Sequence, residues 1–148
     1  MDWVYNDGGR AAAGYIGKTG DCVCRAVAIA TEQDYQVVYD RLAHGNATQR
    51  KTKRSGRASG KRTAADGISV TRKWFKDYLE SLGWRWVPTM GIGTGCMVHL
   101  TEGELPHWGR LIVSVSKHYT AVVDGVIHDL YDPSRAGTRC VYGYWHKP

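Results

Sequence analysis

The stretch GRLIVSVSKHYTAVVDGVIHDLYDP, residues 109–133, decides the fold that the sequence predicts. It reads as two long apolar β-runs that meet at Asp124-Gly125, the dipeptide favoured at the centre of two-residue type I′ hairpin turns. With this turn, Val123 faces Val126, and each step outward pairs the next two residues. The stretch therefore predicts an antiparallel hairpin of known register.

That register assigns each polar side chain of the hairpin to a face. His118 lies opposite Tyr131, and Thr120 lies opposite Asp129. Side chains alternate between the two faces of a strand, so His118, Thr120 and Asp129 share one face. Diagonal neighbours across a ladder are close enough for an imidazole to meet a carboxylate. We therefore expect the hairpin to present a histidine base beside an acid that orients it.

The bulk properties predict a single folded domain over residues 1–148. The chain has 148 residues and 43% hydrophobic residues, enough for a sizeable core. No apolar run approaches the ~18 residues that a membrane helix needs, so we expect no membrane partner. The first ten residues contain no apolar segment typical of a secretory signal. For Cys22, Cys24, Cys96 and Cys140 we therefore expect reduced thiols in a cytoplasm, that of a bacterial host if a phage encodes the chain.

The formal charge of +6 is concentrated in one segment, which we expect to be a surface loop at about 49–63. This segment contains no acid, and its composition offers almost nothing to bury. It is either a solvated loop or a site for nucleic acid or an acidic partner, bound through sequence-indifferent phosphate-type contacts. No aromatic residue interrupts it, so base stacking is not indicated. The basic residues are Arg50, Lys51, Lys53, Arg54, Arg57, Lys61 and Arg62.

The N-terminal half predicts helices, the first of which carries a cysteine at its start. Asp21 is a good N-cap, and the Ala-rich run after it is compatible with a buried helix. Cys22 then lies in the first turn, where free backbone N–H groups and the helix dipole stabilise a thiolate. Further helices are expected at about 32–43, ending at His44-Gly45-Asn46, and at about 70–82. Because the predicted strands come after these helices in the chain, the sequence predicts an α+β domain with an antiparallel sheet.

A cysteine that opens a helix, a histidine on a later strand and a nearby carboxylate are the parts of a thiol-based catalytic triad. Asp21-Cys22 with its small-residue helix, the run His118–Val122 and the following acid resemble the papain-like cysteine peptidase superfamily. The resemblance is to the C39-like and transglutaminase-like branches and to small uncharacterised phage and bacterial proteins. It implies a papain-like fold, Cys22 as nucleophile, His118 as base, no cofactor, and hydrolysis of a peptide, isopeptide or amide bond in a peptide or protein substrate.

Two parts of this constellation stay open at this point. The hairpin register favours Asp129 as the third member, whereas the resemblance also points to Asp132, which precedes Pro133. The family usually has a glutamine shortly before the cysteine to hold the oxyanion, and this sequence has none. The oxyanion would be held by backbone N–H groups or by a side chain such as Lys18 or Thr19.

Other interpretations of the same residues lead elsewhere. Cys22 could be a small buried hydrophobe, which is the common fate of a free cysteine and the one expected for Cys24 and Cys140. Zinc ligation by Cys22, Cys24, Cys96 and His99 is disfavoured by the Cys-x-Cys spacing, so no metal is expected. The rival function is a non-catalytic papain-like module whose basic loop binds nucleic acid or an acidic host protein. His128 alternates away from His118 and is expected to be a surface or structural residue.

Overall fold

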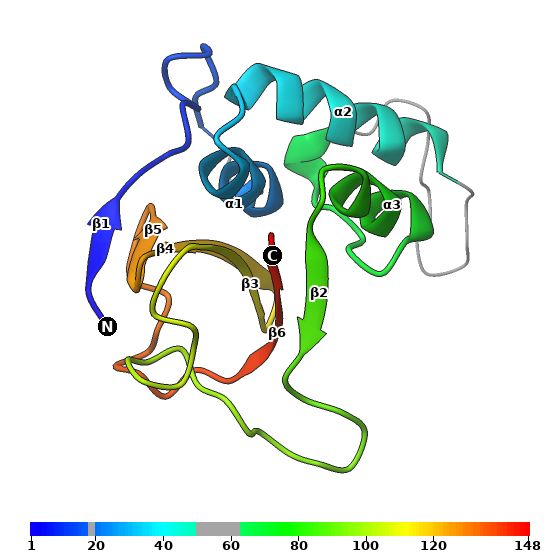
Figure 1. Cartoon of the computed structure of the whole chain (residues 1–148). Coiled ribbons are helices and arrows are strands. Elements are labelled where there is room, and N and C mark those ends of the chain that lie inside the picture. The colour runs from blue at the N-terminus through cyan, green and yellow to red at the C-terminus, as the bar shows by residue number, and fades with distance from the viewer. Residues whose placement is uncertain (18–19, 50–62) are drawn as a thin grey trace.

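The protein is described by a computed structural model that covers residues 1–17, 20–49 and 63–148. Over these residues the fold is α+β, with three α-helices and one six-stranded mixed sheet (Figure 1). The helices are α1 (Cys22–Thr31), α2 (Tyr35–Thr48) and α3 (Lys73–Ser81), with a short 3₁₀ turn at Ala64–Asp66. The strands are β1 (Trp3–Tyr5), β2 (Arg85–Pro88), β3 (Arg110–Val115), β4 (His118–Val123), β5 (Val126–Asp129) and β6 (Val141–His146).

The strands are arranged in the order β1-β5-β4-β3-β6-β2. All neighbours pair antiparallel except β1, which runs parallel to β5. The expectation of an antiparallel sheet is therefore wrong at this edge. The first residues of the chain supply β1, because backbone hydrogen bonds from Ile127 N–H to Asp2 O and from Asn6 N–H to Asp129 O fix them beside β5.

The stretch 109–133 forms three strands rather than two. The predicted turn at Asp124-Gly125 is present, with φ of 47° and 81° at its two residues, and Val123 pairs with Val126. Both central φ values are positive, as a type I′ turn requires. A second reversal lies between β3 and β4, where Lys117 has a φ of 55°. Ser116-Lys117 carries no glycine or asparagine, so sequence patterning did not reveal this turn.

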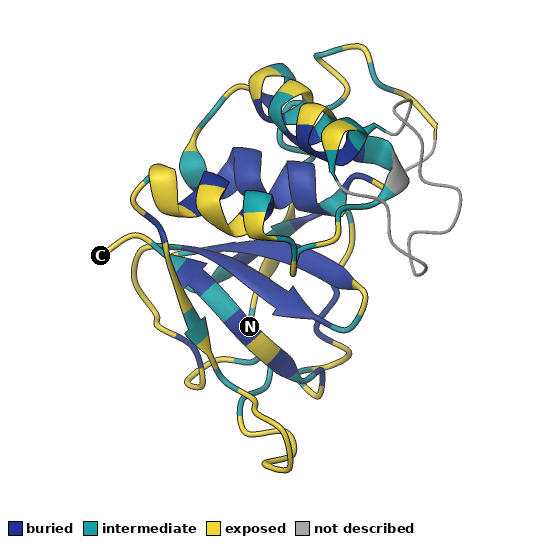
Figure 2. Ribbon diagram, turned by 90° about the vertical axis from the view of Figure 1, so that its right-hand side faces the viewer, coloured by how far each residue is buried: buried dark blue, intermediate teal, exposed yellow. Residues whose placement is uncertain are grey.

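Helix α1 begins at Cys22 as predicted and is buried along most of its length, between the sheet and α2 (Figures 1 and 2). Helix α2 differs from its prediction at both ends. It begins at Tyr35 because the Asp34 carboxylate accepts from the backbone N–H groups of Gln36 and Val37. It continues through Gly45, where a Cβ would come within 2.4 Å of the Trp74 ring. This glycine permits close packing of α2 on α3 rather than ending the helix.

Two apolar clusters flank the sheet. One lies between the helices and β3, β4 and β6, and includes Val27, Leu42, Phe75, Ile112 and Trp145. The other includes Leu100, Leu105, Val113, Val122 and Ile127, so the segment between β2 and β3 covers this face. Alternating residues of β3 therefore contribute to different clusters, as the two-residue period of a strand requires. None of the helices in the described part of the chain is long and apolar enough to cross a membrane.

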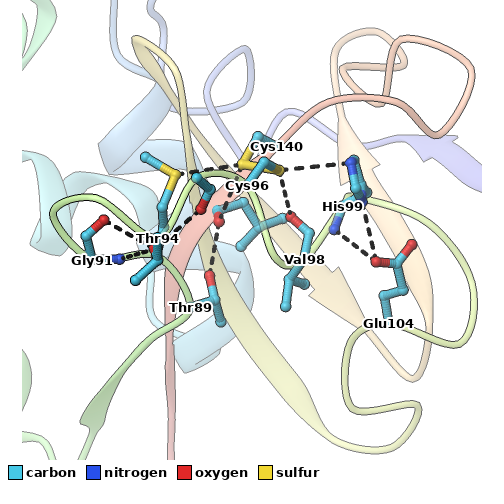
Figure 3. Close-up of a disulfide and its surroundings, with 11 residues drawn as sticks. Thr89, Gly91, Thr94, Cys96, Val98, His99, Glu104 and Cys140 are labelled. Atoms are coloured by element: carbon cyan, nitrogen blue, oxygen red, sulfur yellow. Dashed lines mark hydrogen bonds and ion pairs between the residues drawn. A yellow bond between two sulfur atoms is a disulfide. The ribbon is translucent and has the colours of Figure 1, made fainter.

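A disulfide joins Cys96 to Cys140 (Figure 3), so the expectation of four reduced thiols is wrong for this pair and Cys140 is not a free core thiol. An isolated bridge between His99 and Cys140 brings the loop after β2 against the start of β6. The Cα atoms of the two cysteines are then 5.8 Å apart, within the usual disulfide range. Cys22 and Cys24 remain free, and Cys24 is fully buried as expected.

Candidate active site

A pocket of about 540 Å³ lies where α1 begins and β4 starts. Because β4 and β5 are antiparallel, the first residue of β4, His118, and the last residue of β5, Asp129, lie at the same end of the pair. Cys22, the first residue of α1, lines the same pocket as His118. The pocket is lined by Cys22 and His118 together with Val23, Arg25, Ile68, Val70, Ser114, Lys117, Tyr119, Leu130, Tyr131, Tyr142 and neighbouring residues. Two segments far apart in the sequence, the start of α1 and the start of β4, therefore bring the predicted nucleophile and base to one pocket.

The imidazole of His118 is fixed by the carboxylate of Asp129. His118 Nε2 lies 2.7 Å from Asp129 Oδ2, and the Thr120 hydroxyl donates to the same oxygen at 2.7 Å. Asp129 Oδ1 accepts from the backbone N–H of Leu130 at 2.7 Å. All three side chains are buried, so these hydrogen bonds are shielded from water. His118, Thr120 and Asp129 therefore share a face, as the hairpin register predicts.

The Cys22 thiol is the second partner of His118. Asp129 occupies Nε2, so Nδ1 is the ring nitrogen that is left for the hydrogen bond between His118 and Cys22. Burial raises the pKa of the Cys22 thiol, but several effects together outweigh it. They are the hydrogen bond from His118, the backbone N–H of Tyr119, and the positive charges of His118 and Arg25. The pKa of Cys22 is therefore lower than that of an ordinary cysteine.

The pKa of His118 moves in the opposite direction. Burial disfavours the imidazolium, but the hydrogen bonds and negative charges of Asp129 and Cys22 outweigh burial and raise the pKa of His118 to about 9. A lowered thiol pKa beside a raised imidazole pKa favours a thiolate–imidazolium pair near neutral pH. Cys24, two residues along the same helix, is the opposite case, because burial raises its pKa to about 12.

Asp21 occupies the N-cap position of α1 but does not cap the helix. Its side chain makes no hydrogen bond to the first turn. Instead the buried carboxylate accepts from the Tyr35 hydroxyl and from Arg10 Nε, and it lies 3.3 Å from Arg25 Nε. The Asp21 side chain therefore does not satisfy the N–H groups at the start of α1.

Tyr131 and Arg25 belong to the site although sequence reasoning gave neither of them a role. The Tyr131 ring lies against the His118 ring, with centroids 5.5 Å apart, and it is half exposed beside the pocket. Arg25 lies 3.6 Å from Asp129 through Nη1 and is 4% exposed. The hairpin register does place Tyr131 opposite His118. A single arginine within an Ala-rich buried helix is the signal that could have found Arg25.

The other residues predicted from the sequence to belong to the site either lie away from the pocket or fall outside the described residues. Asp132 is exposed and its carboxylate accepts from the Ser134 N–H, so Asp129 and not Asp132 contacts His118. His128 lies on β5 and bonds to Asn6, away from the pocket. Lys18 and Thr19 lie outside the described residues, as do all seven basic residues of the expected loop, Arg50, Lys51, Lys53, Arg54, Arg57, Lys61 and Arg62.

The zinc set considered from the sequence is not assembled. Cys96 is bonded to Cys140, whereas Cys22 lines the pocket with His118. Within residues 1–17, 20–49 and 63–148, no group of three His, Cys, Asp or Glu side chains is placed to hold a metal ion.

Comparisons of the chain with protein-family models, with curated proteins and with solved structures find no match. A function for the pocket is therefore argued from its own residues. They provide a buried acid, an imidazole hydrogen-bonded to it, a thiol of lowered pKa and an open space beside the thiol. This combination can form and release a covalent thioester.

Proposed function

We propose that the protein is a thiol-dependent acyl-transfer enzyme of papain-like architecture, in which Cys22, His118 and Asp129 form the catalytic triad. The observation that carries the proposal is the 2.7 Å contact between Asp129 Oδ2 and His118 Nε2, in a histidine that lines the same pocket as the Cys22 thiol and lowers the pKa of that thiol. The order of the three residues along the chain and the position of Cys22 at a helix start support the likeness to papain-like peptidases.

The chemistry follows from these positions. The Cys22 thiolate attacks the carbonyl carbon of an amide, a C–S bond forms, and the carbonyl oxygen becomes an oxyanion beside the start of α1. The His118 imidazolium gives its proton to the leaving nitrogen, and the C–N bond breaks. A water then loses a proton to His118 and attacks the thioester, which releases the acid and restores the thiol. Asp129 keeps the imidazole oriented and stabilises its charge throughout.

The pocket walls favour a peptide, isopeptide or amide substrate. Around the thiol they are mostly apolar and aromatic, from Val23, Ile68, Val70, Leu130 and Tyr142. Such walls suit a side chain or backbone segment of a polypeptide rather than a highly charged small molecule. Hydrolysis is our first choice, because water is the second nucleophile that is always present. Transfer to an amine would use the same thioester.

The test is the pH dependence of alkylation by iodoacetamide, with mass spectrometry to assign each modified cysteine. We expect Cys22 to react with an apparent pKa well below the ~8.5 of a free thiol, and His118→Ala to abolish this advantage. His128→Ala is the matched control, because His128 is on the neighbouring strand but outside the pocket, and it should leave the profile unchanged. Buried Cys24 serves as an internal reference.

A second readout separates a reactive thiol from an enzyme. With p-nitrophenyl acetate we expect a burst of nitrophenol equal to the protein concentration, followed by slower turnover, and an acetyl group on Cys22 in the mass spectrum. Cys22→Ser should remove both phases. If Cys22 is inert to iodoacetamide in the folded protein, or if its reactivity is the same without His118, the proposed function is wrong.

A further inference from the structure

Arg25 is a buried arginine in a helix whose other buried residues are apolar. It lies on α1 one turn after Cys22, its neighbours Val23, Cys24 and positions 26–30 are buried, and it lines the same pocket as Cys22. Removing a guanidinium from water costs several kcal/mol unless opposite charges compensate it. The other buried residues of α1 are uncharged, so a buried guanidinium at position 25 needs a specific explanation.

Two carboxylates flank the guanidinium. Arg25 Nε lies 3.3 Å from Asp21 Oδ1, and Arg25 Nη1 lies 3.6 Å from Asp129 Oδ1. Within the described part of the chain neither nitrogen makes a hydrogen bond of good geometry, and neither does Asp21 Oδ1. The contacts are thus ion pairs rather than well-formed hydrogen bonds. Arg25 places a positive charge between the acid before the cysteine and the acid behind the histidine.

We propose that Arg25 is a positioning residue for the acyl-transfer reaction: its guanidinium bridges Asp21 and Asp129, holds the Asp129 carboxylate on His118, and balances the charge of the Cys22 thiolate. This inference rests on the proposed function of the Cys22 site. It adds a residue that acts through Asp129 and through its field at the thiol.

The charges around the pocket show why the guanidinium matters. The negative groups are the Cys22 thiolate on α1, Asp21 just before α1, and Asp129 on β5. The positive groups are Arg25 from α1, the His118 imidazolium from β4, and Arg10, which pairs with Asp21. These six charges cancel. Lys117 in the β3–β4 turn and Tyr119 on β4 also line the pocket. Without Arg25 the remaining five groups carry one net negative charge when Cys22 is ionised, and the next cation is Lys117 on the pocket wall.

A purely structural role is the competing explanation. The same two ion pairs would join α1 to β5 and stabilise the fold without any effect on the thiol. The two explanations predict changes in different measured quantities. A structural role changes the unfolding temperature, whereas a positioning role changes the pH profile of Cys22 in protein that is still folded.

The experiment compares the Cys22 alkylation profile in Arg25→Met, Arg25→Lys and wild type, with folding checked by circular dichroism. For Arg25→Met we expect the apparent pKa of Cys22 to rise by about one pH unit, so that alkylation at pH 6 slows about tenfold. For Arg25→Lys we expect a partial recovery, at least threefold slower than wild type at pH 6, because an ammonium restores the charge but reaches only one carboxylate. Arg110→Met is the control, since Arg110 pairs with Glu32 outside the pocket.

Profiles of Arg25→Met and Arg25→Lys that superimpose on wild type would overturn the inference. If Arg25→Met does not fold, Arg25→Lys decides. If neither variant folds, NMR of the wild-type protein tests the inference. The Arg25 Nε–H resonance should shift with pH at the apparent pKa of Cys22, and it should shift again when Cys22 is carboxamidomethylated. A resonance that does not move would overturn the inference. A wild-type Cys22 without a lowered pKa would instead overturn the proposed function, so the two failures are distinguishable.

Discussion

The Thr120 hydroxyl and the His118 imidazole donate to the same oxygen of Asp129, each at 2.7 Å. The other oxygen accepts the Leu130 N–H and faces Arg25. Burial raises the pKa of the Asp129 carboxyl, but the hydrogen bonds from His118, Thr120 and Leu130 and the charge of His118 outweigh it, so its pKa is lowered. Asp129 is therefore a buried anion whose two oxygens are both engaged, as the orienting member of a triad requires.

Asp129→Asn should weaken the thiolate without changing the shape of the site. The amide keeps a contact to His118 but removes the charge that helps raise the pKa of His118 to about 9. With a less basic imidazole, the Cys22 thiolate loses its partner, and we expect alkylation at pH 6 to slow about tenfold or more. Stopped-flow or mass-spectrometric alkylation rates measure this.

Asp132→Asn is the matched control for Asp129→Asn, because it removes an exposed carboxylate three residues further along the chain. We expect it to leave the alkylation rate within about twofold of wild type, because a solvated charge outside hydrogen-bond reach interacts weakly. The opposite ranking of the two variants would assign the third triad position to Asp132.

The pH dependence of stability should reveal the His118–Asp129 pair in a Cys22→Ala background. There Asp129 remains as a group that raises the pKa of His118 above the unfolded value of about 6.5. A pKa raised by folding stabilises the folded state fully below the unfolded value, and this contribution is lost as the pH rises through the folded value. We expect the free energy of unfolding to fall by about 1–2 kcal/mol as the pH rises above about 6.5.

Urea unfolding at several pH values measures this decrease. His118→Gln added to Cys22→Ala should flatten the curve. The wild type should show a smaller decrease, because the lowered pKa of Cys22 contributes stability that grows with pH over the same interval. A stability of Cys22→Ala that rises above pH 6.5 would show that His118 is not held as an imidazolium by Asp129.

Gly45→Ala should destabilise the protein although alanine favours helices. A Cβ at position 45 would lie 2.4 Å from two ring carbons of Trp74, so the ring or the helix must move. The cost of such overpacking, about 1–3 kcal/mol, exceeds the ~1 kcal/mol gain in helix propensity. Thermal or urea unfolding tests this, with Gly91→Ala as the control, because a Cβ there meets Thr94 at an ordinary 3.6 Å. Equal or higher stability of Gly45→Ala would contradict the packing described.

The central part of the site could be predicted because it depends on local signals. The Asp124-Gly125 turn fixes the register that brings His118 to Asp129, and the Ala-rich run after Asp21 begins a helix at Cys22, although the Asp21 side chain does not cap it. Features that depend on contacts between residues far apart in the sequence could not be predicted in this way. Strand β1 has three exposed residues without an apolar period, and its parallel partner β5 is more than a hundred residues away. The same holds for the pairing of Cys96 with Cys140, which depends on the path of the loop after β2.

Reduction of the Cys96–Cys140 disulfide should lower stability but spare the Cys22 site. The bond closes a loop with a sequence separation of 44, and it joins the segment after β2 to the start of β6. Releasing such a loop costs about 2–4 kcal/mol through the entropy of the unfolded chain. We therefore expect Cys96→Ser/Cys140→Ser to melt at a lower temperature, while the alkylation profile of Cys22 stays that of wild type.

Thiol counting checks the premise of that prediction. Purified wild-type protein unfolded without reductant should show two free thiols, Cys22 and Cys24, and four after reduction. Four thiols before reduction would show that the pair is open in the isolated protein. A loss of Cys22 reactivity in Cys96→Ser/Cys140→Ser would show that the disulfide supports the pocket as well as the fold. Neither Cys96 nor Cys140 is among the described residues that line the pocket, and β6, which follows Cys140, contributes Tyr142 to it, so we expect stability and thiol reactivity to respond separately.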